Sequence, residues 1–176
     1  ADGNAQAPAV IGASLGALIA LKLAESRPVS ALVLVAPGPP AAVRAWSYRQ
    51  RTYPTIVPWA SALEPAETEA SMPEADAATV RWAHGMWRDE SGRVMQAVCD
   101  GIEAAAPDCP CLVQCGEADQ TVPPAICAET ARLLGAEHRR YERVSHVGAL
   151  LGLYSTILAQ EAAGWLARLP GPADRD

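Results

Sequence analysis

Apolar residues fall into short runs along the chain, and the runs alternate between two patterns. Residues 30–36 and the shorter stretch 9–11 are continuous apolar runs bounded by turn residues, which is typical of strands buried on both faces. Residues 15–25 are apolar around nearly the whole helix circumference, which predicts a buried helix that Pro28 ends. Further along we expect a strand over 109–115, a helix from Pro123-Pro124 to Gly135, a more polar strand over 137–144 and a helix over 148–169.

Short links between alternating strands and helices predict an α/β fold, with a mostly parallel sheet and helices on both faces. The stretch 41–95 is different, because it holds six of the nine aromatic residues and all three methionines. We interpret 41–95 as a helical lid insertion over one end of the sheet, with a helix beginning near Pro73 and Ser71 as its cap. The predicted core is then 1–40 and 96–170, and 171–176 is a loose tail.

Net charge and cysteine content narrow the function classes. The formal charge of −6 argues against nucleic acid or an anionic membrane as partner, because both select basic surfaces. All but one of the 14 basic residues are arginine, which indicates a GC-rich, bacterial genome, and no basic leader is evident, so we expect a cytoplasmic protein. The five cysteines are an odd number without nearby histidines, which favours buried free thiols over disulfides or a metal site.

The stretch Gly12-Ala13-Ser14-Leu15-Gly16 lies between the first expected strand and the first expected helix. This G-x-S-x-G pattern on a tight strand-to-helix turn exposes the serine hydroxyl and is typical of a serine nucleophile. The alternative is a glycine-rich turn whose serine only caps the following helix.

Two further residues follow expected strands, and with Ser14 they would meet at the carboxyl edge of a parallel sheet. They are Asp119 and His146. A serine hydroxyl needs an imidazole to accept its proton and a carboxylate to orient that imidazole. Asp119 has alternatives, since it is also a plausible turn residue and Glu117 is a rival acid. His146 has two rivals, of which His84 is better explained by packing within 41–95 and His138 lies at the wrong end of its strand.

These stretches, with Gly116-Glu117-Ala118-Asp119, Val122-Pro123 and Ser145-His146, resemble the nucleophile elbow, acid loop and histidine loop of the α/β-hydrolase fold superfamily. The resemblance implies Ser14 as nucleophile, His146 as general base, Asp119 as its orienting acid, and the Leu15 N–H as one oxyanion-hole donor. No metal or organic cofactor is implied.

The implied activity is hydrolysis of a small-molecule carboxylic ester, with lactones and thioesters as related substrates. C–C bond hydrolases, acyltransferases, and perhydrolases or haloperoxidases share the fold and remain alternatives. A non-catalytic binding or assembly subunit is the alternative from another class.

Only 13 residues precede Ser14, whereas the resemblance implies several strands before the nucleophile and a second oxyanion donor from a loop among them. We therefore expect a C-terminal portion of a larger hydrolase, completed by a missing N-terminal segment or a partner chain. The first strand is then expected at an open, apolar edge of the sheet.

Overall fold

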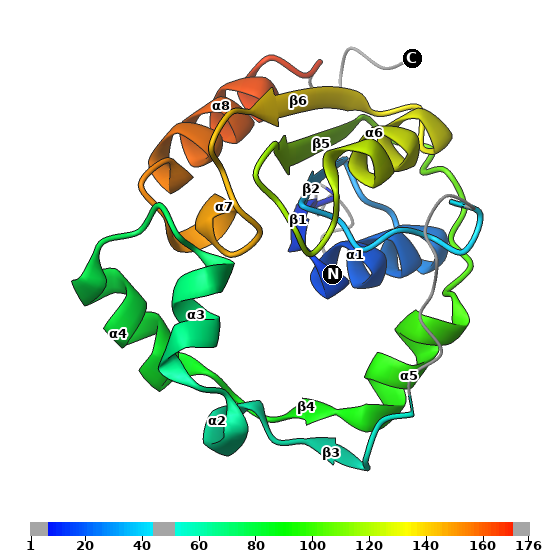
Figure 1. Ribbon diagram of the computed structural model, residues 1–176. Coiled ribbons are helices and arrows are strands. Elements are labelled where there is room, and N and C mark those ends of the chain that lie inside the picture. Colours follow the sequence, from blue (N-terminus) through cyan, green and yellow to red (C-terminus); the bar gives the residue numbers. More distant parts are fainter. Residues whose placement is uncertain (1–6, 44–51, 171–176) are drawn as a thin grey trace, which may run out of the picture.

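The core of the protein is a parallel sheet, seen here in a computed structural model that describes residues 7–43 and 52–170 (Figure 1). The strands are β1 (Ala9–Ala13), β2 (Ala31–Val35), β5 (Cys111–Gly116) and β6 (Glu137–Tyr141), and they pair in the order β1-β2-β5-β6. Every residue of the two central strands, β2 and β5, is buried. Burial on both faces explains why their sequences are continuous rather than alternating apolar runs.

Helices cover both faces of this sheet, as the sequence predicts. Leu32 and Leu34 of β2 join a buried cluster with α1 and α6, whereas Val33 and Val35 point to the other face and join a cluster with α8. These helices are α1 (Leu15–Ser26), α6 (Pro124–Leu133) and α8 (Ser155–Ala167). The strand β1 lies at an edge of the described sheet, also as expected, and its Ile11 is 62% exposed.

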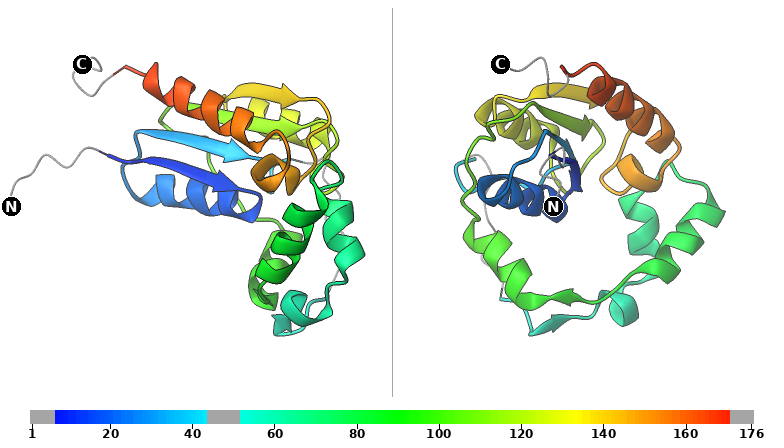
Figure 2. Two further views of the ribbon diagram at one scale, coloured as in Figure 1. Left: turned by 90° about the vertical axis from the view of Figure 1, so that its left-hand side faces the viewer. Right: turned by 180° about the vertical axis from the view of Figure 1, so that it is seen from behind.

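The chain between β2 and β5 includes a stretch that we call the 52–100 segment, which lies beyond the ends to which the strands point (Figure 2). It contains a short antiparallel pair and four helices. These are β3 (Ile56–Val57), α2 (Trp59–Ala62), α3 (Pro65–Ser71), α4 (Ala77–Met86), β4 (Glu90–Ser91) and α5 (Gly92–Asp100). Two of the aromatic residues noted in the sequence, Trp46 and Tyr48, and the tail 171–176 lie outside the described residues.

Two tryptophans of the 52–100 segment make contacts within it. The indole N–H of Trp87 donates to the Thr68 hydroxyl at 2.9 Å, and His84 Nδ1 lies 3.1 Å from the same oxygen. The rings of Trp59 and Trp87 meet edge to face, with centroids 6.2 Å apart. His84 thus packs within the segment, as the sequence suggests.

Three predicted boundaries were wrong. Pro73 lies between two helices, because α3 ends at Ser71 and the next helix begins only where the Asp76 carboxylate caps the N–H groups of Ala78 and Thr79. The last helix is divided into α7 (Gly148–Leu151) and α8, separated at an extended Gly152. The strand β6 ends at Tyr141, before Arg143 takes a positive φ.

No helix among the described residues is long and apolar enough to cross a bilayer.

A disulfide joins Cys115 to Cys127, which corrects the expectation of free thiols for this pair. The two cysteines lie on β5 and on α6, with Cα atoms 6.3 Å apart, within the normal range for a disulfide. The sequence separation of 12 residues does not predict this disulfide, since the approach of the two cysteines depends on how α6 packs on the sheet. Cys111 is a buried thiol, and burial raises its pKa to about 12.

We expect reduction of this disulfide to destabilise the fold by about 3 kcal/mol, because the bond removes entropy from the unfolded chain. Urea unfolding with and without a thiol reductant measures the effect. The variant Cys99→Ser, which keeps the disulfide, should respond to reductant like the parent. Unchanged unfolding midpoints on reduction, or in the double variant Cys115→Ala/Cys127→Ala, would contradict this expectation.

Candidate active site

Ser14 occupies a strained turn between β1 and α1. Its φ of 50° lies in a region that non-glycine residues rarely adopt. The backbone is held there by hydrogen bonds from Ser14 N to Val35 O at 2.9 Å and from Gly38 N to Ser14 O at 3.0 Å. The Ser14 side chain makes no capping bond to α1, which rules out the alternative that this serine only caps the helix.

The two glycines that flank Ser14 are not equivalent. A Cβ atom on Gly12 would lie 2.4 Å from the carbonyl oxygen of Gly16, so only glycine allows β1 and α1 to approach this closely. A Cβ atom on Gly16 would meet nothing within 4 Å. The close approach that shapes the turn therefore depends on Gly12.

We expect Gly12→Ala to disrupt the turn and to destabilise the protein by about 3 kcal/mol, as severe overpacking does. Gly16→Ala should be neutral or slightly stabilising, since alanine is favoured over glycine inside a helix. Thermal unfolding of the two variants measures the difference. Equal losses of stability would show that the contact at Gly12 is not the important one.

Asp119 lies in the loop after β5 and is 4% exposed. One carboxylate oxygen, Oδ1, accepts the backbone N–H groups of Thr121 and Val122, each at 2.8 Å. The other, Oδ2, lies 2.8 Å from His146 Nδ1. Asp119 therefore stabilises its own loop and also contacts the histidine, so these alternatives coexist. The rival acid Glu117 forms a surface ion pair instead, with its Oε1 3.6 Å from Arg140 Nε.

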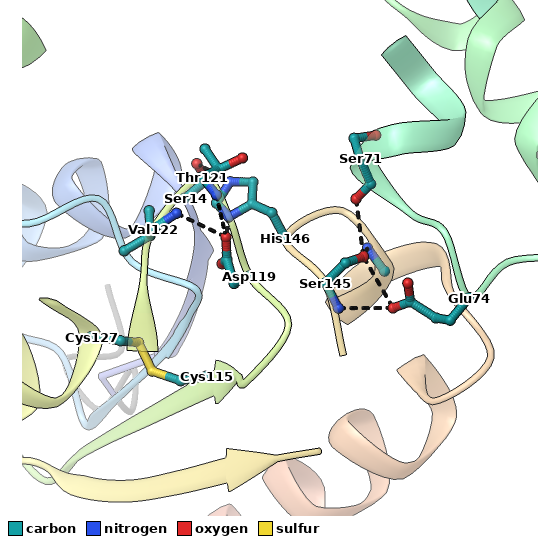
Figure 3. Close-up of polar contacts among 11 residues, drawn as sticks. Ser14, Ser71, Glu74, Cys115, Asp119, Thr121, Val122, Cys127, Ser145 and His146 are labelled. Carbon is teal, nitrogen blue, oxygen red and sulfur yellow. Dashed lines mark hydrogen bonds and ion pairs between the residues drawn. A yellow bond between two sulfur atoms is a disulfide. The ribbon is translucent and has the colours of Figure 1, made fainter. Parts of the chain in front are cut away.

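His146 follows β6 and joins the other two residues. Its Nε2 lies 2.8 Å from Ser14 Oγ, so Ser14, His146 and Asp119 form one continuous hydrogen-bonded chain (Figure 3). The loops that carry Asp119 and His146 approach closely because Gly116 has no side chain, and a Cβ atom there would lie 2.0 Å from Val144 O. The N–H of Ala118 donates to that same carbonyl at 3.1 Å.

Leu15 begins α1, so no earlier carbonyl within the helix accepts its N–H. This places an N–H donor directly after Ser14, at the position that the resemblance assigns to an oxyanion-hole donor.

His138 lies within β6, opposite Val113 in the register, rather than at the strand's carboxyl end. Its Nε2 is buried and has no hydrogen-bond partner among the described residues. Burial lowers the pKa of His138, and the nearby charge of Arg140 lowers it further.

The described residues contain one group with the spacing of metal ligands, formed by Cys115, Cys127 and His138, whose ligand atoms lie within 4.8 Å of one another. Metal binding requires the two sulfurs as thiolates. Because these sulfurs are joined in a disulfide, they are not available as ligands in this state.

Glu74 is a residue near the site that the sequence did not single out. It lies in the link between α3 and α4 and contacts Ser145, directly before His146, across 71 positions of sequence. The neighbouring sequence does not distinguish Glu74, since it is one of several acidic residues in that stretch.

Comparisons with known proteins agree with this architecture. The sequence profile described as the alpha/beta hydrolase family matches residues 1–155. Searching curated protein sequences finds no match.

Solved structures share the fold at low sequence identity. The monoacylglycerol lipase of Paleococcus ferrophilus is 18% identical with a TM-score of 0.64, and the alignment covers 92% of this chain and 68% of that one. For polyneuridine aldehyde esterase the values are 11%, 0.66, 89% and 71%. For a thermophilic esterase from Thermogutta terrifontis they are 15%, 0.62, 91% and 64%. Identities this low indicate a shared fold and leave substrates open.

Proposed function

The chain belongs to the alpha/beta hydrolase family, and on this premise we propose that it is a serine hydrolase that cleaves a carboxylic ester through Ser14, His146 and Asp119. The observation that carries the proposal is the hydrogen-bonded chain from Ser14 Oγ through the His146 ring to Asp119 Oδ2, with both contacts at 2.8 Å. This is the geometry that a serine needs to become nucleophilic near neutral pH.

In the first half of the reaction, Ser14 Oγ attacks the ester carbonyl while His146 Nε2 accepts the hydroxyl proton. Asp119 stabilises the imidazolium that forms, and it holds the ring with its Nδ1 protonated so that Nε2 is free to accept. The imidazolium then passes its proton to the leaving alcohol, and an acyl-enzyme on Ser14 remains.

Negative charge develops on the carbonyl oxygen during this attack. The N–H of Leu15 is our assigned donor for that charge, and one such donor is worth about 3 kcal/mol of transition-state stabilisation. In the second half of the reaction, His146 removes a proton from water, which attacks the acyl-enzyme. His146 then returns this proton to Ser14 Oγ as the bond between Oγ and the acyl carbon breaks, which releases the acid and restores the Ser14 hydroxyl.

The 52–100 segment is our candidate for the substrate-facing cover of this site. Support comes from its position beyond the carboxyl ends of the strands (Figure 2) and from exposed apolar residues on α4, where Trp82 is 57% and Met86 49% exposed. An apolar cover favours an ester with an apolar acyl or alcohol part. Lactones and thioesters fit the same chemistry.

A fluorophosphonate probe tests the proposal, because it phosphonylates an activated serine far faster than an ordinary one. The purified chain is treated with the probe, and peptide mass spectrometry locates the adduct. We expect one adduct on the peptide that contains Ser14, together with hydrolysis of p-nitrophenyl butyrate that falls as labelling proceeds. A folded protein with neither labelling nor hydrolysis, or with an adduct on another serine, would contradict the proposal.

A further inference from the structure

The loop that carries His146 is held by a carboxylate from the 52–100 segment. Glu74 Oε1 accepts the backbone N–H of Ser145 at 2.9 Å and lies 3.1 Å from the Ser145 hydroxyl (Figure 3). The backbone of the same segment also contacts this loop. Ser71 O lies 3.0 Å from the Ser145 hydroxyl and accepts the N–H of Val147 at 3.3 Å. The single Ser145 hydroxyl proton serves either Glu74 or Ser71, and both acceptors belong to one segment.

Glycines of the α7 region make room for this carboxylate. A Cβ atom on Gly148 would lie 1.8 Å from Glu74 Oε1, and one on Gly152 would lie 3.1 Å from it. The N–H of Gly148 also donates to the Ser145 hydroxyl at 3.2 Å. The Glu74 carboxylate therefore fits a place where the chain has no side chain, beside a Ser145 that is only 4% exposed.

A contribution to stability alone does not account for the contact between the Glu74 carboxylate and Ser145. The second Glu74 oxygen, Oε2, is buried and has no hydrogen-bond partner among the described residues. An unpaired buried polar atom lowers the free energy of unfolding, and more so when the group carries charge. A function for Glu74 in arranging the neighbouring loop accounts for its presence there.

We propose that Glu74 is a positioning residue for His146. Its carboxylate fixes the peptide group that immediately precedes His146, which sets where the imidazole stands between Ser14 and Asp119. Glu74 has its hydrogen bonds with Ser145 and none with the reacting side chains, so it acts through the loop and is not a catalytic residue. The assignment rests on the proposed hydrolase function, because it acts through the general base of that reaction.

The proposal also gives the 52–100 segment a role in assembling the site. Hydrogen bonds join residues 71–74 to residues 145–147, so a displacement of that segment is passed to the histidine loop. A displacement of about 1 Å in such a loop is enough to slow catalysis about 100-fold.

Steady-state kinetics on p-nitrophenyl butyrate test this proposal with three variants. We expect Glu74→Ala to lower kcat by about 10- to 100-fold while KM changes less than about twofold, as for a misplaced reacting group. Glu74→Gln keeps an oxygen that accepts the Ser145 N–H, so it should recover most of kcat. Glu69→Ala, an exposed glutamate on the same segment, is the matched control and should behave like the parent.

Proton NMR of the His146 Nδ1 proton, which is deshielded by its bond to Asp119, gives a readout that does not need turnover. We expect Glu74→Ala to shift or broaden this signal and Glu69→Ala to leave it unchanged. A parent chain that hydrolyses no ester, but whose Nδ1 signal still responds to Glu74→Ala, would overturn the hydrolase function and keep the positioning role.

Other outcomes overturn the positioning role itself. These are a folded Glu74→Ala variant with kcat within twofold of the parent and an unchanged Nδ1 signal, or a Glu74→Gln variant as impaired as Glu74→Ala. If Glu74→Ala does not fold, Glu74→Asp replaces it, because it keeps the charge but withdraws the carboxylate by one methylene group. The same loss of kcat is expected there, and parent-like kinetics would overturn the proposal.

Discussion

Ser14→Ala is expected to lower kcat for p-nitrophenyl butyrate by about 10⁶-fold, since Ser14 is the nucleophile of the proposed mechanism and its removal abolishes the acyl-enzyme route. Alanine takes away the oxygen that His146 Nε2 contacts at 2.8 Å and leaves the turn's backbone bonds in place. The fold should be retained, because Ser14 makes no side-chain bond to the helix that it precedes. The effect is measured as the residual hydrolysis rate at several enzyme concentrations, and thermal unfolding checks that the variant is folded.

The matched control is Ser26→Ala. Ser26 is an exposed serine at the other end of α1, where its hydroxyl donates to backbone carbonyls of the same helix. Its replacement should leave kcat and fluorophosphonate labelling unchanged. Turnover by Ser14→Ala within tenfold of the parent would assign the nucleophile to another residue and would overturn the mechanism proposed above.

The sequence predicted the parts of the fold that depend on local pattern. The buried run of β2 and the helix α1 were found within one residue of their ends, because continuous apolar residues and an all-round apolar helix have few other solutions. The carboxyl-edge rule for parallel sheets then predicted that Ser14, Asp119 and His146 would converge, although 132 positions separate the first from the last.

The features that the sequence missed depend on tertiary contacts. The Cys115–Cys127 disulfide forms because α6 packs over the end of β5, and cysteine spacing cannot report that packing. Glu74 can approach Ser145 closely only because Gly148 has no side chain. In the sequence, Gly148 is indistinguishable from any glycine at the start of a helix. The helix expected at Pro73 begins later, because the Asp76 side chain offers the better cap.

Asp119→Asn is expected to lower kcat by about 10⁴-fold with little change in stability. The reason lies in how the carboxylate is held. Asp119 Oδ1 accepts two backbone N–H groups, from Thr121 and Val122, so the amide oxygen of asparagine should take that place. The amide nitrogen then faces His146 Nδ1 in the position of Oδ2, and as a donor it requires Nδ1 to be the unprotonated nitrogen. The proton moves to His146 Nε2, which can no longer accept from Ser14.

Glu117→Gln provides the control for this variant, since it removes the same charge two residues away in the same loop. Glu117 is exposed and contacts Arg140 at 3.6 Å, and such surface pairs contribute little to stability. Its kcat should stay within about twofold of the parent, a change that corresponds to less than about 1 kcal/mol. If Glu117→Gln were the inactive variant and Asp119→Asn the active one, the orienting acid would be Glu117. Equal, small effects from both would mean that His146 needs no carboxylate to hold its tautomer, and the contact between Nδ1 and Oδ2 would then serve the loop alone.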